Sequence, residues 1–327
     1  MLEGKSVLYL NDEHIAAIRT DWSALIDVIR QAVYCVDKGD FAQPLKPYLR
    51  YRNPKNRIIA MPAFVGGPFE SAGIKWIASF PENLKRGLPR AHSVVVLNDA
   101  DTGVPVSVIN TPRLSVLRTA AVSGLVMESA ASSRYTKLFN LAIIGWGPIG
   151  QAHFQMMTSC FGDRIQKILL HDVKRLNKGS IEADFGPKVF IADTWQEAYE
   201  QADVIVTCTV ASSRYITRPP KPGALLLHVS LRDYVPEALN TVRAIIVDDW
   251  EEVCREQTDI ELLHKEYGLS KAQTRSIADV VCRRAMAEWG PDEPVLFCPM
   301  GLSVFDIAMG SHYAGLARQK GLGQELL

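Results

Sequence analysis

The spacing of apolar and polar positions changes near residue 138, and the two parts of the chain predict different structures. Before that point, helical spacing predicts one helix over residues 21–38 and another, rich in small residues, over residues 115–130. Strands are predicted between these helices at residues 57–62, 73–78, 93–98 and 104–109. An Asp/Gly turn at residues 99–103 separates the last two, which is typical of a hairpin. The first part is therefore predicted to be α+β.

After residue 138, strands and helices are predicted to alternate. The strands are expected at residues 138–144, 166–171, 188–191, 203–208, 224–229 and 243–247. Helical patterns lie at residues 148–160 and 195–201, and a last amphipathic helix is predicted over residues 303–320. Several of these strands are continuous apolar runs, which is typical of a parallel sheet covered on both faces. The fold class predicted is α/β, with a Rossmann-like doubly wound parallel sheet and an α+β domain.

Residues 138–162 carry no Asp, Glu, Lys or Arg over 25 positions, which is long enough to cross a membrane. However, this stretch contains Asn140, Pro148, Gln151 and several glycines. We therefore interpret it as a strand, a turn and a helix.

Composition and charge narrow the functional classes. The 327 residues suggest about two domains, and 36 basic residues balance 36 acidic ones. This balance argues against nucleic acid or an anionic membrane as the partner. The six cysteines include no C-x-x-C pair, and the histidines have no zinc-site spacing, so we expect neither a disulfide framework nor a metal. Early charges of both signs argue against a signal peptide, and we expect a reducing cytoplasm.

A glycine motif at the start of the second part predicts a dinucleotide site. Gly145, Gly147 and Gly150 fit G-x-G-x-x-G, with Pro148 and Ile149 completing the turn. An apolar strand precedes the motif and a helical pattern follows it. Gly145 allows a tight turn, Gly147 admits a pyrophosphate close to the backbone, and Gly150 lets helix and strand approach. The first helical turn then offers N–H groups to phosphate.

Asp172 ends the next strand, 22 residues beyond the last glycine of the motif. A carboxylate there would accept hydrogen bonds from ribose hydroxyls and repel a 2′-phosphate, which favours NAD over NADP. Lys174 and Arg175 follow closely and weaken that preference. FAD and a glycine turn without a ligand are the alternatives.

The first part is locally basic although the chain is neutral. Between Phe41 and Ser93 there are nine Lys or Arg residues and only two acids. Arginine forks bind carboxylates in bidentate fashion, so this excess suits a substrate with several carboxylates. A solvated basic face is the plainer explanation for any one of these residues, and nucleic-acid binding is a weaker third.

Three charged residues stand out individually. Lys75 interrupts an apolar strand, and burial would lower its pKa and fit it for proton transfer. Arg118 is a cation among small residues. Asp233 follows an apolar run at the predicted carboxyl edge of the sheet, where ligands bind, although a turn or cap role would also explain it. His92 is a further candidate, but a lone histidine is more often structural.

Together these motifs resemble the ornithine cyclodeaminase/μ-crystallin family over nearly the whole chain. The resemblance rests on Met61–Ala63, Gly73–Trp76, Leu97–Pro105, Leu117–Ala121, the Gly145–Gly150 turn and Thr207–Thr209. It implies an NAD(P)-dependent homodimer. It also implies a substrate-binding and dimerisation domain of residues 1–118 plus 303–327, and an NAD-binding domain of residues 119–302.

The resemblance also assigns roles to residues. Lys75 and Arg118 would contact the substrate carboxylate, and Thr119 would lie near the cofactor phosphates. The further cofactor contacts expected are Thr207, Thr209, Ser230, Met300 and Gly301. Asp233 matches the catalytic acid of an N-A-x-G-x-D pattern, but His228-Val-Ser-Leu-Arg-Asp233 lacks its Asn and Gly. This departure argues against ornithine cyclisation.

Within the family, four segments resemble enzymes that oxidise N-(1-amino-1-carboxy-2-ethyl)-glutamate for siderophore synthesis: Gln43–Arg50, Arg57–Pro62, Gly73–Ile77 and Val247–Trp250. That substrate carries three carboxylates and yields 2,3-diaminopropionate and 2-oxoglutarate. Lys46 or Arg50, together with Arg90, are expected to bind carboxylates, and Lys75 and Asp233 to be catalytic. The alternatives are ornithine cyclodeaminase, a small-amino-acid or imine dehydrogenase, and a μ-crystallin-like binding protein.

Overall fold

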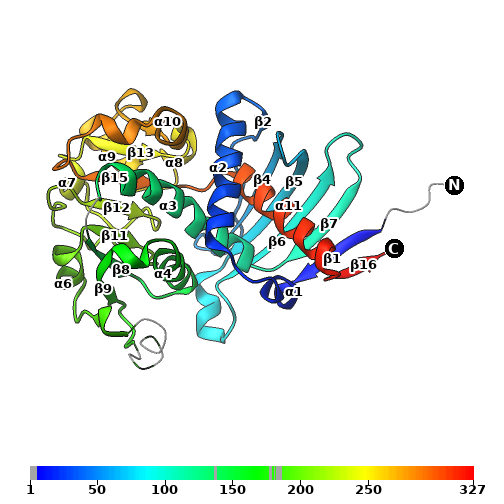
Figure 1. Cartoon of the computed structure of the whole chain (residues 1–327), viewed down its shortest axis with the longest axis horizontal. Coiled ribbons are helices and arrows are strands. Elements are labelled where there is room, and N and C mark those ends of the chain that lie inside the picture. The colour runs from blue at the N-terminus through cyan, green and yellow to red at the C-terminus, as the bar shows by residue number, and fades with distance from the viewer. Residues whose placement is uncertain (1–5, 136–137, 177–178, 180, 182–185) are drawn as a thin grey trace. The chain divides into compact units, whose positions relative to one another are not determined.

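The computed structural model describes residues 6–135, 138–176, 179, 181 and 186–327 (Figure 1). The chain forms two compact units. Unit 1 is Met1–Arg118 with Gly301–Leu327, and unit 2 is Thr119–Met300. The bounds expected from the sequence differ from these only in the placement of residues 301 and 302.

Unit 1 is built on a mixed sheet with the order β16-β1-β7-β6-β5-β4-β2, and β3 also pairs with β4. Its strands are β1 (Val7–Asn11), β2 (Phe41–Ala42), β3 (Tyr48–Leu49), β4 (Arg57–Val65), β5 (Ser71–Ser79), β6 (Ala91–Asp99), β7 (Pro105–Asn110) and β16 (Gln324–Leu326). The strands from β2 to β7 pair antiparallel, and β1 pairs parallel with β7. The predicted hairpin at residues 99–103 is confirmed as the β6–β7 connection.

Helices cover one face of this sheet. They are α1 (Asp12–Ala17), α2 (Trp22–Lys38) and α11 (Ser303–Lys320). The 3-10 helix η1 (Pro81–Arg86) lies in the connection between β5 and β6, and α3 (Arg113–Ser133) begins in this unit. The side chain of Asp21 caps α2, and Gly39 ends it in the left-handed conformation, as the sequence predicts. α2 and α11 pack against each other, and α11 runs along β4, β5 and β6 (Figure 1).

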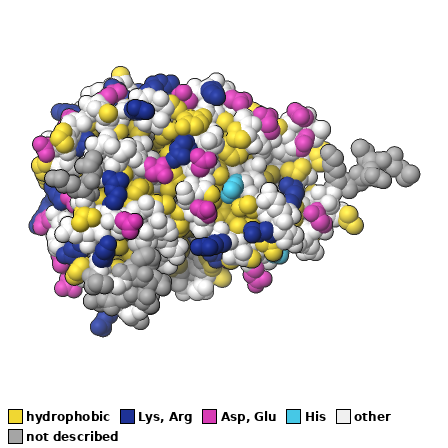
Figure 2. All heavy atoms as spheres, viewed as in Figure 1, with side chains coloured by type: hydrophobic (Ala, Val, Ile, Leu, Met, Phe, Trp, Pro, Cys, Tyr) yellow, Lys and Arg dark blue, Asp and Glu magenta, His cyan; other side chains and the backbone are white. Residues whose placement is uncertain are grey.

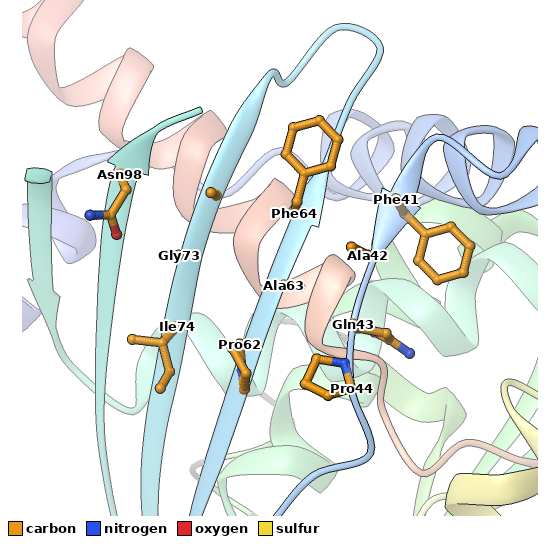
Figure 3. Close-up of a pocket in the computed structure, with 11 residues that line it drawn as sticks. Phe41, Ala42, Gln43, Pro44, Pro62, Ala63, Phe64, Gly73, Ile74 and Asn98 are labelled. Carbon is orange, nitrogen blue, oxygen red and sulfur yellow. The ribbon is translucent and has the colours of Figure 1, made fainter. Parts of the chain in front are cut away.

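The opposite face of the sheet is apolar and half-exposed. Pro62 and Ile74 are paired on β4 and β5, and their side chains point away from α11 into a shallow hollow (Figure 3). Trp76 lies two residues further on the same face and is 43% exposed. Antiparallel sheets commonly place polar residues on an open face, so this composition is unusual.

Unit 2 contains a fully parallel sheet with the order β10-β9-β8-β11-β12-β15-β13-β14. Its strands are β8 (Phe139–Ile144), β9 (Ile165–His171), β10 (Val189–Ile191), β11 (Val204–Thr207), β12 (Leu225–His228), β13 (Ala244–Val247), β14 (Arg275–Ser276) and β15 (Val295–Cys298). The central strands are buried along their length, as continuous apolar runs predict. The doubly wound α/β fold is therefore confirmed.

Helices connect these strands. The longer ones are α4 (Pro148–Phe161), α6 (Trp195–Gln201), α9 (Asp259–Tyr267) and α10 (Ile277–Arg283), and the short ones are α7 (Pro236–Leu239) and α8 (Trp250–Val253). The 3-10 turns are η2 (Gly162–Arg164), η3 (Gly186–Lys188), η4 (Lys271–Gln273) and η5 (Ala285–Glu288). Residues 139–161 form β8, a turn and α4, as predicted. Among the described helices only α3 passes a length-and-hydropathy test for a membrane span, and 72% of its apolar window is buried.

On the face shown in Figure 2, basic and acidic side chains are interspersed over both units. This distribution agrees with the zero net charge of the chain.

Candidate active site

A buried cluster of charges lies in unit 1 between β5, α3 and α11. Lys75 Nζ lies 2.6 Å from Asp306 Oδ2, and Arg118 Nε lies 2.9 Å from Asp306 Oδ1. The exposed fractions of Lys75, Arg118 and Asp306 are 2%, 6% and 1%. Lys75 also donates to Ser115 Oγ at 3.4 Å. One carboxylate thus holds two cations that the sequence singles out separately.

The surroundings of Lys75 bring the pKa of its amine close to neutral pH. Burial lowers the pKa of Lys75 to about 7, and the opposing attraction of Asp306 does not cancel that effect. Burial alone would raise the pKa of Asp306, but the charges of Arg118 and Lys75 hold it below its usual value. Lys75 is buried, as its proposed role requires, and with this lowered pKa its amine can hold or release a proton near pH 7.

Of the two alternatives Lys46 and Arg50, the structure brings Lys46 to this cluster. Lys46 is 3% exposed, and its charge lowers the pKa of Lys75. Arg50 is exposed, lies over the Tyr48 ring and donates to the Pro54 carbonyl. Gly301 also lies against this cluster, because a Cβ there would be 2.4 Å from an Arg118 nitrogen.

A second cationic group lies at the end of the β4–β5–β6 ladder. Arg90 is half-buried, and both burial and the neighbouring charge of Arg57 lower its pKa. The Nε of Arg57 is buried and has no hydrogen-bond partner. Within the described part of the chain, neither guanidinium pairs with an acidic side chain. Because their positive charges are not neutralised by an acidic side chain, these two arginines can bind an anion. The structure places His92 next to this group with its side chain exposed.

In unit 2 the glycine motif forms the turn between β8 and α4. Gly145 has φ +102°, and a Cβ there would lie 2.7 Å from the Cys208 backbone. A Cβ on Gly150 would lie 2.0 Å from the Gly145 carbonyl oxygen. By contrast, a Cβ on Gly147 would meet no atom within 4 Å. No side chain caps the first turn of α4, which begins at Pro148 and continues with Ile149.

This turn lies where the strand order of the sheet reverses. β8 has β9 as its neighbour on one side and β11 on the other. In sheets of this kind, ligands bind at the carboxyl ends of the strands where the order reverses. Asp172, just after β9, accepts hydrogen bonds from the backbone N–H groups of Trp146 and Lys174 at 2.7 and 2.8 Å. The cradle of glycines and the adjacent carboxylate therefore fit a dinucleotide.

Asp233 lies in unit 2, 1% exposed, and its carboxylate accepts only hydroxyl hydrogens among the described side chains. Thr209 Oγ1 lies 2.6 Å from Asp233 Oδ1, and Tyr215 OH lies 3.3 Å from Oδ2. Ser230 Oγ makes a short hydrogen bond to Oδ2. Burial and the nearby Asp233 charge raise the pKa of Tyr215. Three predicted site residues, Thr209, Ser230 and Asp233, thus meet.

The remaining predicted residues have simpler surroundings. Thr119 is half-buried within α3, and the backbone N–H of Met300 donates to Asp248 at 3.0 Å. Thr207 is fully buried and bonds to His228. No three His, Cys, Asp or Glu side chains in the described ranges are placed to hold a metal ion.

Sequence reasoning missed Asp306, Arg57 and His228 as site residues. Asp306 carries the same signal as Lys75, since it interrupts the apolar run Val304–Met309. Arg57 belongs to the local basic excess and to the segment Arg57–Pro62, but neither pattern singles it out as a site residue. His228 was noted only because it departs from the family pattern.

Comparisons with known proteins agree with this architecture. The N-((2S)-2-amino-2-carboxyethyl)-L-glutamate dehydrogenase of Staphylococcus aureus is 32% identical, and the alignment covers 98% of each chain. The Thermococcus litoralis Δ1-pyrroline-2-carboxylate reductase, solved with NADH and L-proline, superposes with a TM-score of 0.87 at 22% identity, over 98% of this chain and 100% of that one. An archaeal alanine dehydrogenase dimer with bound NAD gives a TM-score of 0.82 at 22% identity, over 98% and 99%.

The sequence profile that matches this chain spans residues 10–313 and describes the ornithine cyclodeaminase/mu-crystallin family. This match takes in both units and every site residue named above. The protein is therefore a member of the ornithine cyclodeaminase/mu-crystallin family.

Proposed function

We propose that the protein is an NAD-dependent amino-acid dehydrogenase that oxidises and hydrolyses N-((2S)-2-amino-2-carboxyethyl)-L-glutamate. The products would be L-2,3-diaminopropionate and 2-oxoglutarate, with one NADH and one proton released for each water consumed. The observation that carries this proposal is the pair of cationic groups in unit 1, around Lys75 and around Arg57, on one face of one sheet. The similarity to the Staphylococcus aureus dehydrogenase supports it.

Unit 2 is the proposed cofactor unit. The backbone at Gly145, Gly147 and Gly150, with the first turn of α4, would hold the pyrophosphate, and Asp172 would bind the ribose. Bound NAD would supply the hydride acceptor. Thr119, Thr207, Thr209, Ser230, Met300 and Gly301 remain proposed contacts of the same cofactor.

Unit 1 is the proposed carboxylate-binding unit. Lys75, Arg118 and Lys46 would bind one carboxylate, and Arg90 with Arg57 would bind another. Arg57 lies four residues before Met61, the partner of Lys75 across the β4–β5 ladder, so both cations leave the same face. That offset is about 13 Å along the strand. Cations so separated suit a substrate with carboxylates at more than one end.

Two groups are proposed to handle protons. The substrate amine must lose a proton as its carbon is oxidised to the imine, and water must then lose a proton as it adds to that imine. Lys75, with a pKa of about 7, can accept or return a proton at neutral pH. Asp233 is the proposed base for water, because its carboxylate is held by hydroxyl donors and not neutralised by a cation among the described residues of unit 2.

We further propose that the open face of the unit 1 sheet is the homodimer interface. Its half-exposed apolar residues, with Pro62, Ile74 and Trp76 among them, need a cover that a second copy of the same face can provide. A reducing cytoplasm suits six cysteines that are all present as thiols, and the 2,3-diaminopropionate product would serve siderophore or peptide synthesis.

The deciding measurement is absorbance at the reduced-nicotinamide band with purified protein, NAD and synthetic N-((2S)-2-amino-2-carboxyethyl)-L-glutamate. We expect NADH to accumulate in step with 2-oxoglutarate. L-ornithine is the parallel sample. Proline and ammonia from ornithine, with no net NADH, would instead identify a cyclodeaminase. Cofactor binding without turnover of either compound would contradict the proposed reaction.

Arg90→Ala tests the second carboxylate contact. We expect the substrate KM to rise at least tenfold, because a bidentate contact to a carboxylate is lost, while the KM for NAD stays unchanged. Arg86→Ala, an exposed arginine on η1, is the matched control. An unaltered substrate KM in Arg90→Ala would remove Arg90 from the site.

A further inference from the structure

A continuous chain of hydrogen-bonding groups leads from Asp233 to a buried histidine. Ser230 Oγ bonds to Asp233 Oδ2 and lies 3.0 Å from Thr207 Oγ1. Thr207 Oγ1 lies 2.7 Å from His228 Nδ1. Thr207 and His228 are both 0% exposed and face each other at the carboxyl ends of β11 and β12.

A carboxylate holds the far side of this histidine. His228 Nε2 lies 2.7 Å from Asp259 Oδ2, at the start of α9. Arg214 Nε lies 2.7 Å from Asp259 Oδ1, and the Tyr234 backbone N–H donates to Oδ2 at 3.0 Å. Because Asp259 accepts hydrogen bonds from both of these donors, it acts as the acceptor toward His228 as well, and His228 Nε2 carries the hydrogen of that contact. In neutral His228, Nδ1 is then the acceptor.

Counting hydrogens shows what this chain can do. While Asp233 is a carboxylate, Ser230 donates to it, Thr207 donates to His228 Nδ1, and the Ser230–Thr207 contact holds no hydrogen. When Asp233 takes a proton, it can donate to Ser230, which turns to donate to Thr207. One hydrogen then moves at each link, so that the proton arrives on His228 Nδ1 and Asp233 is a carboxylate again. The imidazolium so formed remains paired with Asp259. The reverse shift returns the proton through Asp233 to the amine that leaves when the carbinolamine collapses, so the chain ends the turnover as it began.

We propose that His228, oriented by Asp259, is a relay residue that takes the proton collected by Asp233 and so restores the base. This inference rests on the proposed function for the role of Asp233. His228 acts only through Thr207 and Ser230, so it is a positioning residue and not a catalytic one. His228 stands where the N-A-x-G-x-D pattern has Asn. The relay explains this difference, because an Asn could form hydrogen bonds with the same neighbours but could not take a proton.

Other titratable groups surround this pair. The Tyr234 ring packs edge-on against His228, with ring centres 4.8 Å apart, and burial raises the pKa of Tyr234. Cys298, on β15, is buried, and its thiol pKa is raised by that burial and by the charges of Asp259 and Asp248. Tyr215 faces Asp233 from the other side. Arg214 is the cation that balances Asp259.

A kinetic comparison tests the relay. We expect His228→Asn to lower kcat at least tenfold, with substrate and NAD KM within about threefold, and to remove one limb of the kcat–pH profile. Ser230→Ala breaks the chain next to Asp233, and its kcat should fall similarly. The double variant should be no slower than the slower single variant, because both act on one chain. Losses that multiply in the double variant, or an unchanged pH profile, would overturn the relay.

Further variants, at Thr207 and at His153, distinguish a relay from a structural role of His228. Thr207→Ser keeps the hydroxyl and should retain the pH profile, whereas Thr207→Val should lose the same limb as His228→Asn. His153→Asn removes another fully buried imidazole, which bonds to Ile149 and Ser123 and not to this chain. It should change stability but leave the limb in place.

A measurement without turnover tests the chemistry of the chain directly. ¹⁵N-histidine NMR, with His228 assigned through His228→Asn, should show neutral His228 protonated at Nε2 and gaining its second proton at Nδ1. A neutral Nδ1–H form would overturn the relay, because Nδ1 could not accept. If the expected form is found but the proposed substrate is inert, the proposed reaction fails while the proton path in this chain stands.

Discussion

At the scale of single residues, Lys75 links burial to pH. In the folded protein burial lowers the pKa of this amine to about 7, from a usual value of 10.5. Below pH 7 both folded and unfolded chains keep the proton, and the cost of burying the charge is fully present. Above pH 7 the folded amine is neutral while the unfolded one stays charged, so the folded state gains stability as the pH rises.

We therefore predict that wild type gains stability over Lys75→Met as the pH rises. The difference in the free energy of unfolding should change by about 1.4 kcal/mol per pH unit between pH 7 and 10. Urea unfolding of both proteins at pH 7, 8 and 9 measures this difference. Groups that titrate alike in wild type and variant contribute equally to both and drop out of the difference. A difference that does not depend on pH would contradict a lowered Lys75 pKa.

Asp172 is the residue that we expect to set the cofactor choice. Its carboxylate would repel a 2′-phosphate, and Lys174 and Arg175 nearby would attract one once that carboxylate is gone. Asp172→Ser should lower the ratio of kcat/KM for NAD to that for NADP at least tenfold. Asp163→Ser, on the 3-10 turn before β9, is the control and should leave the ratio alone. An unchanged ratio in Asp172→Ser would show that this carboxylate does not contact the ribose.

Individual site residues could be predicted from the sequence where they break a local pattern. Lys75 does so in an apolar strand, and Gly145 and Asp172 occupy fixed places in a short motif. Their partners could not be predicted in the same way, because Asp306 lies 231 positions from Lys75 and only the fold of unit 1 brings them together. Asp259 likewise meets His228 from another element.

At the scale of elements, the β8–α4 turn contains one glycine that the fold requires, Gly150, and one, Gly147, that we propose as a cofactor contact. A Cβ on Gly150 would collide with the Gly145 carbonyl, so Gly150→Ala should destabilise the protein by about 1–3 kcal/mol. Gly147 has φ −74° and open space around its Cα, so Gly147→Ala should leave the melting temperature within a degree or two. If that space holds the pyrophosphate, the same variant should weaken NADH binding at least tenfold.

NADH fluorescence titration and thermal melting, each on both variants, test this prediction. The informative result is loss of affinity without loss of stability in Gly147→Ala. Wild-type affinity in that variant would place the pyrophosphate elsewhere. A large fall in its melting temperature would instead show that Gly147 serves the fold.

Elements with a clear hydrophobic period were predicted close to their observed bounds. The helix expected at residues 303–320 is α11, and the strands expected at 57–62 and 73–78 lie within the longer β4 and β5. β15 was missed, because Val295–Cys298 is an apolar run of only four residues. It pairs between β12 and β13, and such parallel pairing is decided by the whole sheet and not by neighbours in sequence.

At the scale of the whole molecule, the open face of the unit 1 sheet bears on assembly. Side chains alternate along β5, so Lys75 lies on the helix-covered side and Ile74 and Trp76 lie on the open side. Figure 3 shows Ile74 on this open side. We predict that wild type sediments as a dimer and that Trp76→Asp sediments as a monomer, because a charge would be buried in an apolar interface. Tyr267→Asp, which charges an equally exposed aromatic position on α9, should stay dimeric.

Sedimentation velocity over a range of concentrations makes the comparison, and circular dichroism confirms that each variant is folded. Dimeric Trp76→Asp would exclude this face as the interface, and a monomeric wild type would leave the apolar face for a different partner.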